Sequence, residues 1–235
     1  MIYKRVLLKI SGEALLASDG KPIDQKFLTY LSKEIRPVYD AGVQIAIVVG
    51  GGNIFRGLNA NEETGLDRVT GDHMGMLGTV INSLALKAAF EANGMPARTM
   101  TAIEINKVAE PFIRGRALRH LEKGRIVIFG AGTGNPYFTT DTAAALRAAE
   151  IGAEVLIKAT KVDGLYDKDP AKFKDAVFIK KTTYQEAISK KLRVMDMTAL
   201  SLCEENRLPV KIVNIFTSGN ILKAIIDDSV GSLVS

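Results

Sequence analysis

The apolar runs of this chain constrain its fold most strongly, because they do not alternate with polar residues. Residues 45–49 (IAIVV) and 126–129 (IVIF) are apolar at every position. Such runs are typical of strands in a parallel sheet that is covered on both faces, since both rows of side chains must then be buried. We expect six main strands and short edge strands near 178 and 232–234; the main strands are 5–10, 43–49, 97–101, 125–129, 154–158 and 210–216.

Amphipathic segments of helical length separate the expected strands. Residues 24–41 carry one apolar face, with Asp24 as the N-cap and Gly42 at the end. A second long helix is expected at 72–93, with inward-facing Met74, Leu77, Ile81, Leu84 and Ala88. Further helices are expected at 106–122, 141–151, 184–190, 195–206 and 219–227. Strands and helices that alternate in this way predict an α/β fold, in which an open, mainly parallel sheet is sandwiched between helices.

Length and composition favour one domain that spans residues 1–235. The chain has 235 residues, 47% of them hydrophobic, and no linker or repeat marks a boundary. Its net charge of +5 is scattered, which fits a protein that handles polyanionic small molecules as well as one that contacts nucleic acid weakly. No apolar run is long enough to span a membrane, and the lone Cys203 is best read as a small buried side chain. We therefore expect a cytoplasmic protein.

Three glycine-rich segments follow expected strands: KISGE at 9–13, GGGNIFRG at 50–57 and GAGTGNPYFTTD at 130–141. A strand that ends in a glycine loop and opens a helix binds phosphate well, because backbone N–H groups and the helix dipole both face the anion. In parallel sheets ligands bind beyond the carboxyl ends of the strands. Three such loops at one edge predict a site for two phosphate-bearing ligands. Residues 58–59 (LN) replace the Lys-Ser/Thr of a Walker loop, which separates this chain from the P-loop kinases.

Several charged residues in these loops allow both a structural and a functional reading. Lys9 is either a strand lysine that reaches the sheet edge or a point charge between two phosphates. Arg56 is either a solvated loop residue or a phosphate contact. Asp141 and Asp72 lie near helix starts, where the helix dipole alone favours a carboxylate. Thr139 or its neighbour Thr140 can cap the helix that follows without any ligand.

The segment 158–170 (KATKVDGLYDKDP) follows another expected strand and contains the turn pairs Asp-Gly and Asp-Pro. Its threonine, tyrosine and carboxylates could hold a purine, a ribose and a hydrated magnesium ion, although plain turn chemistry also explains them. His73 and His120 have no partner residues that suggest a catalytic role. The chain contains no Ser-His-Asp order, no HExxH motif and no Cys/His cluster.

Taken together, these motifs resemble the bacterial uridylate kinases of the amino acid kinase superfamily. The matching pieces are KISGE (9–13), VVGGGNIFRG (48–57), GDHMGML (71–77), GTGNPYFTTD (132–141), LIKATKVDGLYDKDP (156–170) and RVMDMTA (193–199). They follow the order of that family and cover nearly the whole chain. GDHMGM and TGNPYFTTD are specific to it, whereas the glycine triplet and KISGE are shared across the superfamily.

The resemblance implies the reaction ATP + UMP → ADP + UDP, with Mg²⁺ bound through the nucleotide and no direct protein ligand. It implies an acceptor-nucleotide half at about 1–150 and an ATP-binding half at about 151–235. The implied ATP residues are Lys9, Ile10, Ser11, Gly12, Gly52, Arg56, Thr160, Tyr166 and Asp169. The implied UMP residues are Gly51, Asp72, Thr133, Gly134, Asn135, Pro136, Tyr137, Phe138, Thr139 and Thr140. Lys9, Arg56 and Asp141 are the implied catalytic residues.

The resemblance also implies a homohexamer that GTP activates and UTP inhibits. The segment that aligns with the effector region of the family consists of Ala17, Ser18, Asp19, Gly20, Lys21 and Pro22. The loop 58–66 is idiosyncratic and could alter closure over the site without changing the reaction.

Two rival functions stay open: a kinase for a small carboxylate or carbamate, and a non-catalytic protein that senses nucleotides or binds nucleic acid. The long loop 132–141 and Asp72 favour a nucleotide acceptor. A nucleic-acid binder would show a basic stripe with interleaved aromatic residues, which the sequence lacks. We expect neither a membrane nor a nucleic acid to be required.

Overall fold

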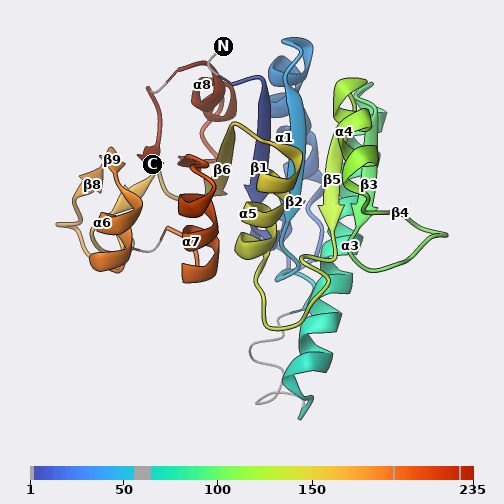
Figure 1. Ribbon diagram of the computed structural model, residues 1–235, viewed down its shortest axis with the longest axis horizontal. Helices are drawn as coiled ribbons and strands as arrows, with labels where there is room; N and C mark the ends of the chain where they lie inside the picture. The colour runs from blue at the N-terminus through green and yellow to red at the C-terminus, as the bar shows by residue number, and fades with distance from the viewer. Residues whose placement is uncertain (1–2, 56–64, 193, 228) are drawn as a thin grey trace.

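A computed structural model describes residues 3–55, 65–192, 194–227 and 229–235, and within them a nine-stranded sheet forms the centre (Figure 1). The strand order is β4-β3-β5-β2-β1-β6-β10-β11-β9, and only the β10–β11 pair is antiparallel. The strands are β1 (Arg5–Ile10), β2 (Gln44–Val49), β3 (Ala97–Thr101), β4 (Glu110–Pro111), β5 (Ile126–Gly130), β6 (Val155–Thr160), β9 (Lys181–Thr182), β10 (Val210–Asn214) and β11 (Ser232–Val234). A small antiparallel pair, β7 (Leu165–Tyr166) and β8 (Phe178–Ile179), forms a separate sheet that contacts Ser232 of β11.

Helices cover both faces of the sheet, as Figure 1 shows. They are η1 (Gly12–Leu15), α1 (Gln25–Asp40), α3 (Arg68–Ala92), α4 (Arg114–Glu122), α5 (Thr140–Ile151), α6 (Tyr184–Ser189), α7 (Met197–Glu205) and α8 (Asn220–Ile226). One buried cluster joins the sheet to α1, α3 and α8, and a second joins it to α4, α5, α6 and α7. Val6 and Leu8 of β1 belong to the first cluster, whereas Leu7 between them belongs to the second. The unbroken apolar runs therefore mark strands buried on both sides, and the predicted α/β fold is confirmed.

All six predicted main strands are present, and their ends shift by no more than two residues. Asp24 caps α1, because its side chain accepts a hydrogen bond from the backbone N–H of Lys26. Among the described residues, no helix is both long and apolar enough to cross a membrane.

The predicted helix at 106–122 is wrong in its first half. Residues 110–111 form the short strand β4, and the helix begins only at Arg114. Pro111 explains the difference: proline lacks the N–H that a helix interior needs, and it disfavours helical backbone at the residue before it. The helix α3, by contrast, is longer than predicted: it begins at Arg68, four residues before its predicted start. The side chain of Asp67 caps it there by accepting hydrogen bonds from the N–H groups of Val69 and Thr70.

The predicted inward face of α3 is also wrong. Met74, Leu77 and Ile81 are 37%, 48% and 45% exposed. The buried face instead contains small and polar residues such as Gly78 and Asn82. A Cβ at Gly78 would lie 3.2 Å from the carbonyl oxygen of Gly51, so the helix approaches the glycine triplet too closely for larger side chains. Close packing against that loop therefore overrides the apolar periodicity, and an apolar stripe of α3 is left on the surface.

Candidate phosphoryl-transfer site

The carboxyl ends of four adjacent parallel strands, β5, β2, β1 and β6, lie at one edge of the sheet (Figure 1). The three glycine-rich turns that follow β1, β2 and β5 touch one another there. A Cβ at Gly50 would lie 2.8 Å from the backbone nitrogen of Gly12 and 3.6 Å from Oγ1 of Thr140. Segments that are far apart in the sequence thus form one surface, as expected for parallel strands.

The close approach of these turns requires glycine. A Cβ at Gly12 would lie 2.7 Å from the carbonyl oxygen of Gly50, and one at Gly51 would lie 2.5 Å from the carbonyl oxygen of Gly75. No side chain fits at such distances unless the backbone moves. The turns and α3 enclose a cavity of about 330 Å³ whose lining includes Ser11, Gly12, Gly50, Gly51, Gly52, Asp72, Phe138, Thr139 and Thr140.

A buried cluster of three charges lies at the same edge. The Nζ atom of Lys9 lies 2.6 Å from Oδ1 of Asp141, and Nζ of Lys158 donates to Oδ2 at 2.8 Å. Burial raises the pKa of Asp141, but the two ammonium groups outweigh it and hold this pKa below its usual value. Burial, together with the charge of Lys9, lowers the pKa of Lys158, although Asp141 opposes the shift. Asp141 therefore stays ionised and holds two lysines side by side.

Sequence reasoning missed Lys158, although a signal for it exists. Lys158 pairs in register with Lys9 across the β1–β6 ladder, so both side chains leave the sheet at the same level. Both lysines also interrupt otherwise apolar strands near their carboxyl ends. Two such lysines on neighbouring parallel strands are a pattern that a register argument could have found.

Asp196 is a second residue that was missed. Its side chain caps α7 by accepting from the N–H of Ala199 at 2.8 Å. It also accepts hydrogen bonds from the hydroxyl groups of Thr139 and Thr142. Thr139 in turn caps α5 by accepting from the N–H groups of Asp141 and Thr142. One carboxylate thus connects the starts of the two helices and supports the turn that carries Asp141.

Asp72 fixes the loop 132–139 to α3. Its two oxygens accept from Nε of Arg68 at 2.8 Å, and Oδ2 also accepts from the backbone N–H of Tyr137 at 2.7 Å. Tyr137 has a φ of 70°, a left-handed conformation that costs a non-glycine residue energy, so this contact holds a strained turn in place. The Arg68 guanidinium lies 5.5 Å from the centre of the Tyr137 ring.

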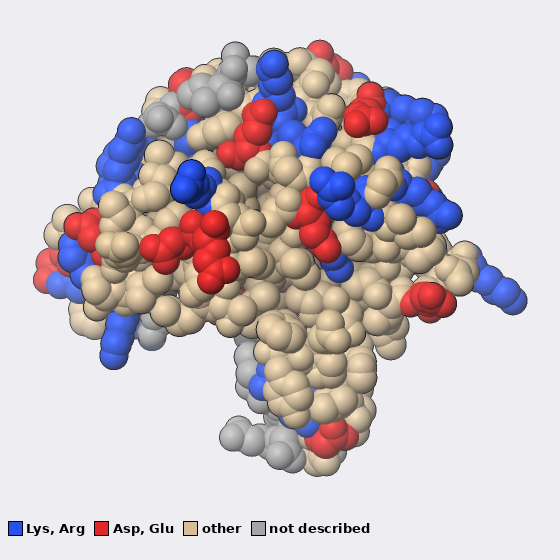
Figure 2. Space-filling model, viewed as in Figure 1, with Lys and Arg blue, Asp and Glu red and all other residues tan. Residues whose placement is uncertain are grey.

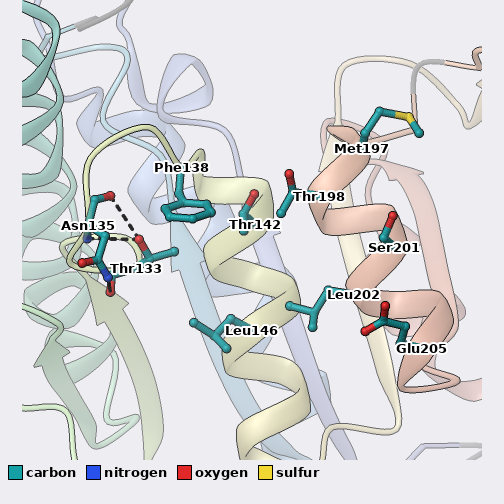
Figure 3. A pocket seen from close by; sticks show the side chains of 10 residues that line it. All are labelled: Thr133, Asn135, Phe138, Thr142, Leu146, Met197, Thr198, Ser201, Leu202 and Glu205. Atoms are coloured by element: carbon teal, nitrogen blue, oxygen red, sulfur yellow. Dashed lines mark hydrogen bonds between the residues drawn. The ribbon is translucent and has the colours of Figure 1, made fainter.

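A larger cavity of about 630 Å³ lies between α5 and α7 (Figure 3). Phe138 lines both this cavity and the 330 Å³ one, so the two adjoin at this residue. Thr133 and Asn135 form the rim, where the Asn135 N–H donates to Oγ1 of Thr133 at 3.1 Å. The other lining residues come from the two helices: Thr142, Leu146, Met197, Thr198, Ser201, Leu202 and Glu205.

Two further cavities lie near the carboxyl end of β6. The first, of about 250 Å³, contains Lys9, Ser11, Lys158, Thr160 and Lys161 in its wall. The second, of about 550 Å³, is lined by residues that include Gly164, Tyr166, Asp169 and Phe173. The hydroxyl group of Thr160 donates to the carbonyl oxygen of Val162 at 2.8 Å, in the segment that connects the two cavities. The sequence-predicted residues 160, 166 and 169 are thus divided between two spaces connected by one short segment.

Not every predicted residue can be assigned to these cavities. Arg56, and residues 58–64 of the loop 58–66, lie outside the described residues. The segment 17–22 forms a turn in which the Ala17 N–H donates to the carbonyl oxygen of Lys21 at 2.9 Å, and its residues line none of the cavities above. Its last residue, Pro22, nevertheless reaches the glycine loop, since its carbonyl oxygen accepts from Asn53.

A fold of this kind, with cationic and glycine-rich turns at the carboxyl edge of a parallel sheet, is shared with known kinases. The sequence profile of the amino acid kinase family matches residues 4–214, and the chain therefore belongs to that family. The chain is 55% identical over 233 residues to a uridylate kinase of Methylococcus capsulatus, and the match covers 99% of this chain and 97% of that protein.

Solved structures agree with this assignment. A UMP kinase from Bacillus anthracis superimposes with a TM-score of 0.96 at 41% identity, covering 100% of this chain and 97% of the other. A UMP kinase from Ureaplasma parvum superimposes with a TM-score of 0.93 at 36% identity and covers 100% of both chains. Within the amino acid kinase family, the chain therefore groups with the uridylate kinases.

Proposed function

We propose that this protein is a UMP kinase, which transfers the γ-phosphoryl group of ATP to UMP and releases ADP and UDP. One observation carries the proposal: Lys9 and Lys158 of the charged cluster line the 250 Å³ cavity, and Thr140, the neighbour of Asp141, lines the 330 Å³ cavity. Ser11 and Glu13 line both the 250 Å³ and the 330 Å³ cavity, so the two spaces adjoin. Two phosphate-bearing molecules, one in each cavity, would meet with their phosphates at the lysines.

ATP occupies the donor side in this proposal. Its phosphates lie against Lys9, Ile10, Ser11, Gly12, Gly52 and Arg56, and its nucleoside lies near Thr160, Tyr166 and Asp169. The side chains of Lys9, Lys158 and Lys161 line the donor cavity and suit a polyphosphate. Mg²⁺ would shield the phosphate charges during transfer. Because both oxygens of Asp141 already face ammonium groups, we assign the ion to the nucleotide phosphates rather than to a direct protein ligand.

UMP occupies the acceptor side, held by Gly51, Asp72 and the residues Thr133, Gly134, Asn135, Pro136, Tyr137, Phe138, Thr139 and Thr140. Asp72 would accept hydrogen bonds from the ribose hydroxyls. Its oxygens already accept from Arg68 and Tyr137, but a carboxylate has about four lone-pair sites and can take further donors. Binding of UMP would then strengthen the contact between α3 and the loop 132–139.

The chemistry requires no general base, since a phosphate oxygen of UMP is already an anionic nucleophile. The main task is to align two polyanions that repel each other and to stabilise the charge on the moving phosphoryl group. Lys9 and Lys158 supply positive charge at fixed positions, and Asp141 holds them there. In this role Asp141 is a positioning group, because its lowered pKa leaves it a weak base.

We extend the proposal to assembly as a homohexamer. The exposed apolar stripe of α3, formed by Met74, Leu77 and Ile81, supports contact with a second copy of the chain. In Figure 2 the part of the molecule that projects below the sheet, where α3 lies, carries little charge on the face shown. Residues 1–235 act as one domain in this proposal, and the contact of Asp141 with Lys158 supports it, because it joins the acceptor and ATP halves.

Regulation by GTP as activator and UTP as inhibitor completes the proposal, with GTP bound near Ala17–Pro22. The contact between Pro22 and Asn53 supports this assignment, since it gives the segment a direct link to the glycine loop. The proposed substrates of the enzyme, ATP and UMP, are intracellular nucleotides, so we place the enzyme in the cytoplasm.

A coupled assay for ADP, with ATP and each of UMP, CMP, dUMP, carbamate and acetylglutamate, tests the proposal. We expect UMP to give the highest kcat/KM. Fastest turnover with carbamate or acetylglutamate would support the small-carboxylate rival, and no ADP with any acceptor would support a sensor.

A further inference from the structure

The side chains of Asn53 and Asn82 face each other behind the glycine-rich turn and exchange two hydrogen bonds. Nδ2 of Asn53 donates to Oδ1 of Asn82 at 3.0 Å, and Nδ2 of Asn82 donates to Oδ1 of Asn53 at 2.7 Å. Asn82 lies in α3 and is fully buried, and Asn53 follows the glycine triplet 50–52. Such a reciprocal pair fixes the orientation of both amides.

The remaining N–H of each amide points to a backbone carbonyl group. Asn82 donates to the carbonyl oxygen of Gly50 at 2.7 Å, and Asn53 donates to that of Pro22 at 2.6 Å. A primary amide has two N–H donors, so all four donors of the pair are used. If either amide were reversed, its oxygen would face a carbonyl oxygen. The pair therefore has one favourable arrangement.

The pair also touches the turn after β1. A Cβ at Gly12 would lie 2.6 Å from Oδ1 of Asn53, so the Gly12 backbone packs directly on this amide. The two side chains thus contact four parts of the chain: the ATP-side turn at Gly12, the acceptor-side turn at Gly50, the helix α3, and the segment that ends at Pro22. A shift of any one part would disturb the bonds to the others.

We propose that Asn53 and Asn82 form one positioning unit, which sets the distance between the two phosphate-binding turns and couples them to residues 17–22. Neither side chain is placed to act on the reacting atoms; the pair acts through the backbone of Gly12 and Gly50. A misplacement of reacting groups by about 1 Å can reduce turnover by about 10²-fold. The inference rests on the proposed UMP kinase activity, which supplies the assay.

The first test compares kcat at saturating ATP and UMP for Asn53→Ala, Asn82→Ala and the double variant, each corrected for the folded fraction. We expect each single variant to lose about 10²-fold in kcat. We expect the double variant to lose little more than either single variant, since both remove the same unit. Asn206→Ala is the matched control. Within the described part of the chain, its exposed amide donates only to the carbonyl oxygen of Leu202, one helical turn away, so the variant should keep the wild-type kcat.

The second test measures hydrogen exchange of the backbone amides of Ala17 and Gly20 in Asn82→Ala. Among the described residues, Asn82 forms no hydrogen bond with the segment 17–22, and Asn53 links it to the carbonyl oxygen of Pro22. Coupling predicts that these two amides exchange at least about tenfold faster than in the wild type, whereas a merely local role of Asn82 would leave them unchanged.

If Asn82→Ala does not fold, Asn82→Asp keeps the side-chain volume and replaces the donor to Gly50 with an acceptor, and the same losses are expected.

The outcomes separate the inference from the proposed function. An inactive wild-type protein would contradict the kinase proposal itself. An active wild type whose folded single variants stay within about threefold of its kcat would overturn the positioning role. Losses that multiply in the double variant would also overturn it, because two independent residues would then be at work. Unchanged exchange at Ala17 and Gly20 would overturn the coupling to 17–22.

Discussion

Replacing Asp141 with asparagine removes the negative charge between Lys9 and Lys158 while it keeps the side-chain volume. The side chains of the two lysines are only 10% and 18% exposed, so their charges would then lie near each other with little water and without the carboxylate that pairs with both. Breaking a buried ion pair by removal of one partner costs about 3–5 kcal/mol. For a chain of this size, each kcal/mol lowers Tm by about 2–4 °C. We therefore expect Asp141→Asn to unfold at least about 6 °C below the wild type.

The loss should depend on pH and on phosphate. The pKa of Asp141 is lowered in the folded protein, so its contribution to stability is present above its unfolded pKa of about 3.9 and is lost as the pH falls through its folded pKa. The difference in unfolding free energy between the two proteins should therefore shrink below about pH 4. ATP should raise Tm more in Asp141→Asn than in the wild type, because its phosphates replace the missing counter-ion.

Thermal unfolding at pH 7 with and without ATP measures the Tm shifts, urea unfolding at pH 7 and pH 3.5 measures the pH dependence, and Asp19→Asn is the control. Asp19 also pairs with a lysine at 2.7 Å, but both side chains are exposed, so this variant should change Tm little. We also expect kcat of Asp141→Asn to fall by about 10²–10³-fold, since two transition-state donors lose their orientation. If Asp141→Asn were as stable and as active as the wild type at pH 7, the role assigned to the buried cluster would be refuted.

Three further predictions concern single residues. Lys9→Ala should lower kcat by about 10²–10³-fold, and near-normal turnover of the folded variant would refute its role in transfer. Cys203 is fully buried, as predicted from the sequence, and burial raises the pKa of its thiol to about 12. The neutral thiol therefore contributes fully to stability below about pH 8.5, the unfolded pKa, and this contribution is lost as the pH rises towards the folded pKa. Urea titrations should therefore show a steeper alkaline loss for the wild type than for Cys203→Ala, by up to about 1.4 kcal/mol per pH unit, and parallel curves would contradict this. Lys211→Met should lower the unfolding free energy by about 2–4 kcal/mol and leave kcat unchanged. The reason is that the buried Nζ of Lys211 donates to the carbonyl oxygens of Ala224 and Asp227 at the end of α8. Equal urea midpoints for the variant and the wild type would count against this.

Much of the fold could be predicted because its signals are local. An apolar run such as 45–49 indicates a strand that is buried on both faces. Asp24 indicates the start of a helix, because its side chain caps the helix by accepting from a backbone N–H two residues later. The apolar stripe of α3 misled the prediction for a physical reason. Its inner face approaches the glycine loop so closely that only small and hydrogen-bonding residues fit, and the periodicity of Met74, Leu77 and Ile81 marks the outer face instead.

The site was less predictable, because its contacts join residues that are far apart in the sequence. Lys9 and Asp141 were found through their turns, but Lys158 matters only through its register with Lys9 in the neighbouring strand. Asp196 reads locally as a helix cap, and only the folded chain brings the hydroxyl groups of Thr139 and Thr142 to it. A side chain that acts through a distant partner can be recognised from one sequence only if the strand register that brings the two together is also inferred, as for Lys9 and Lys158.

A crystal structure with UMP and a non-hydrolysable ATP analogue would test the central claim most directly. The account predicts that the UMP phosphate and the γ-phosphate of the analogue both lie within hydrogen-bonding distance of the Lys9 ammonium, with UMP against Gly51 and Asp72. A UMP phosphate bound instead in the groove between α5 and α7, away from Lys9 and Lys158, would contradict it.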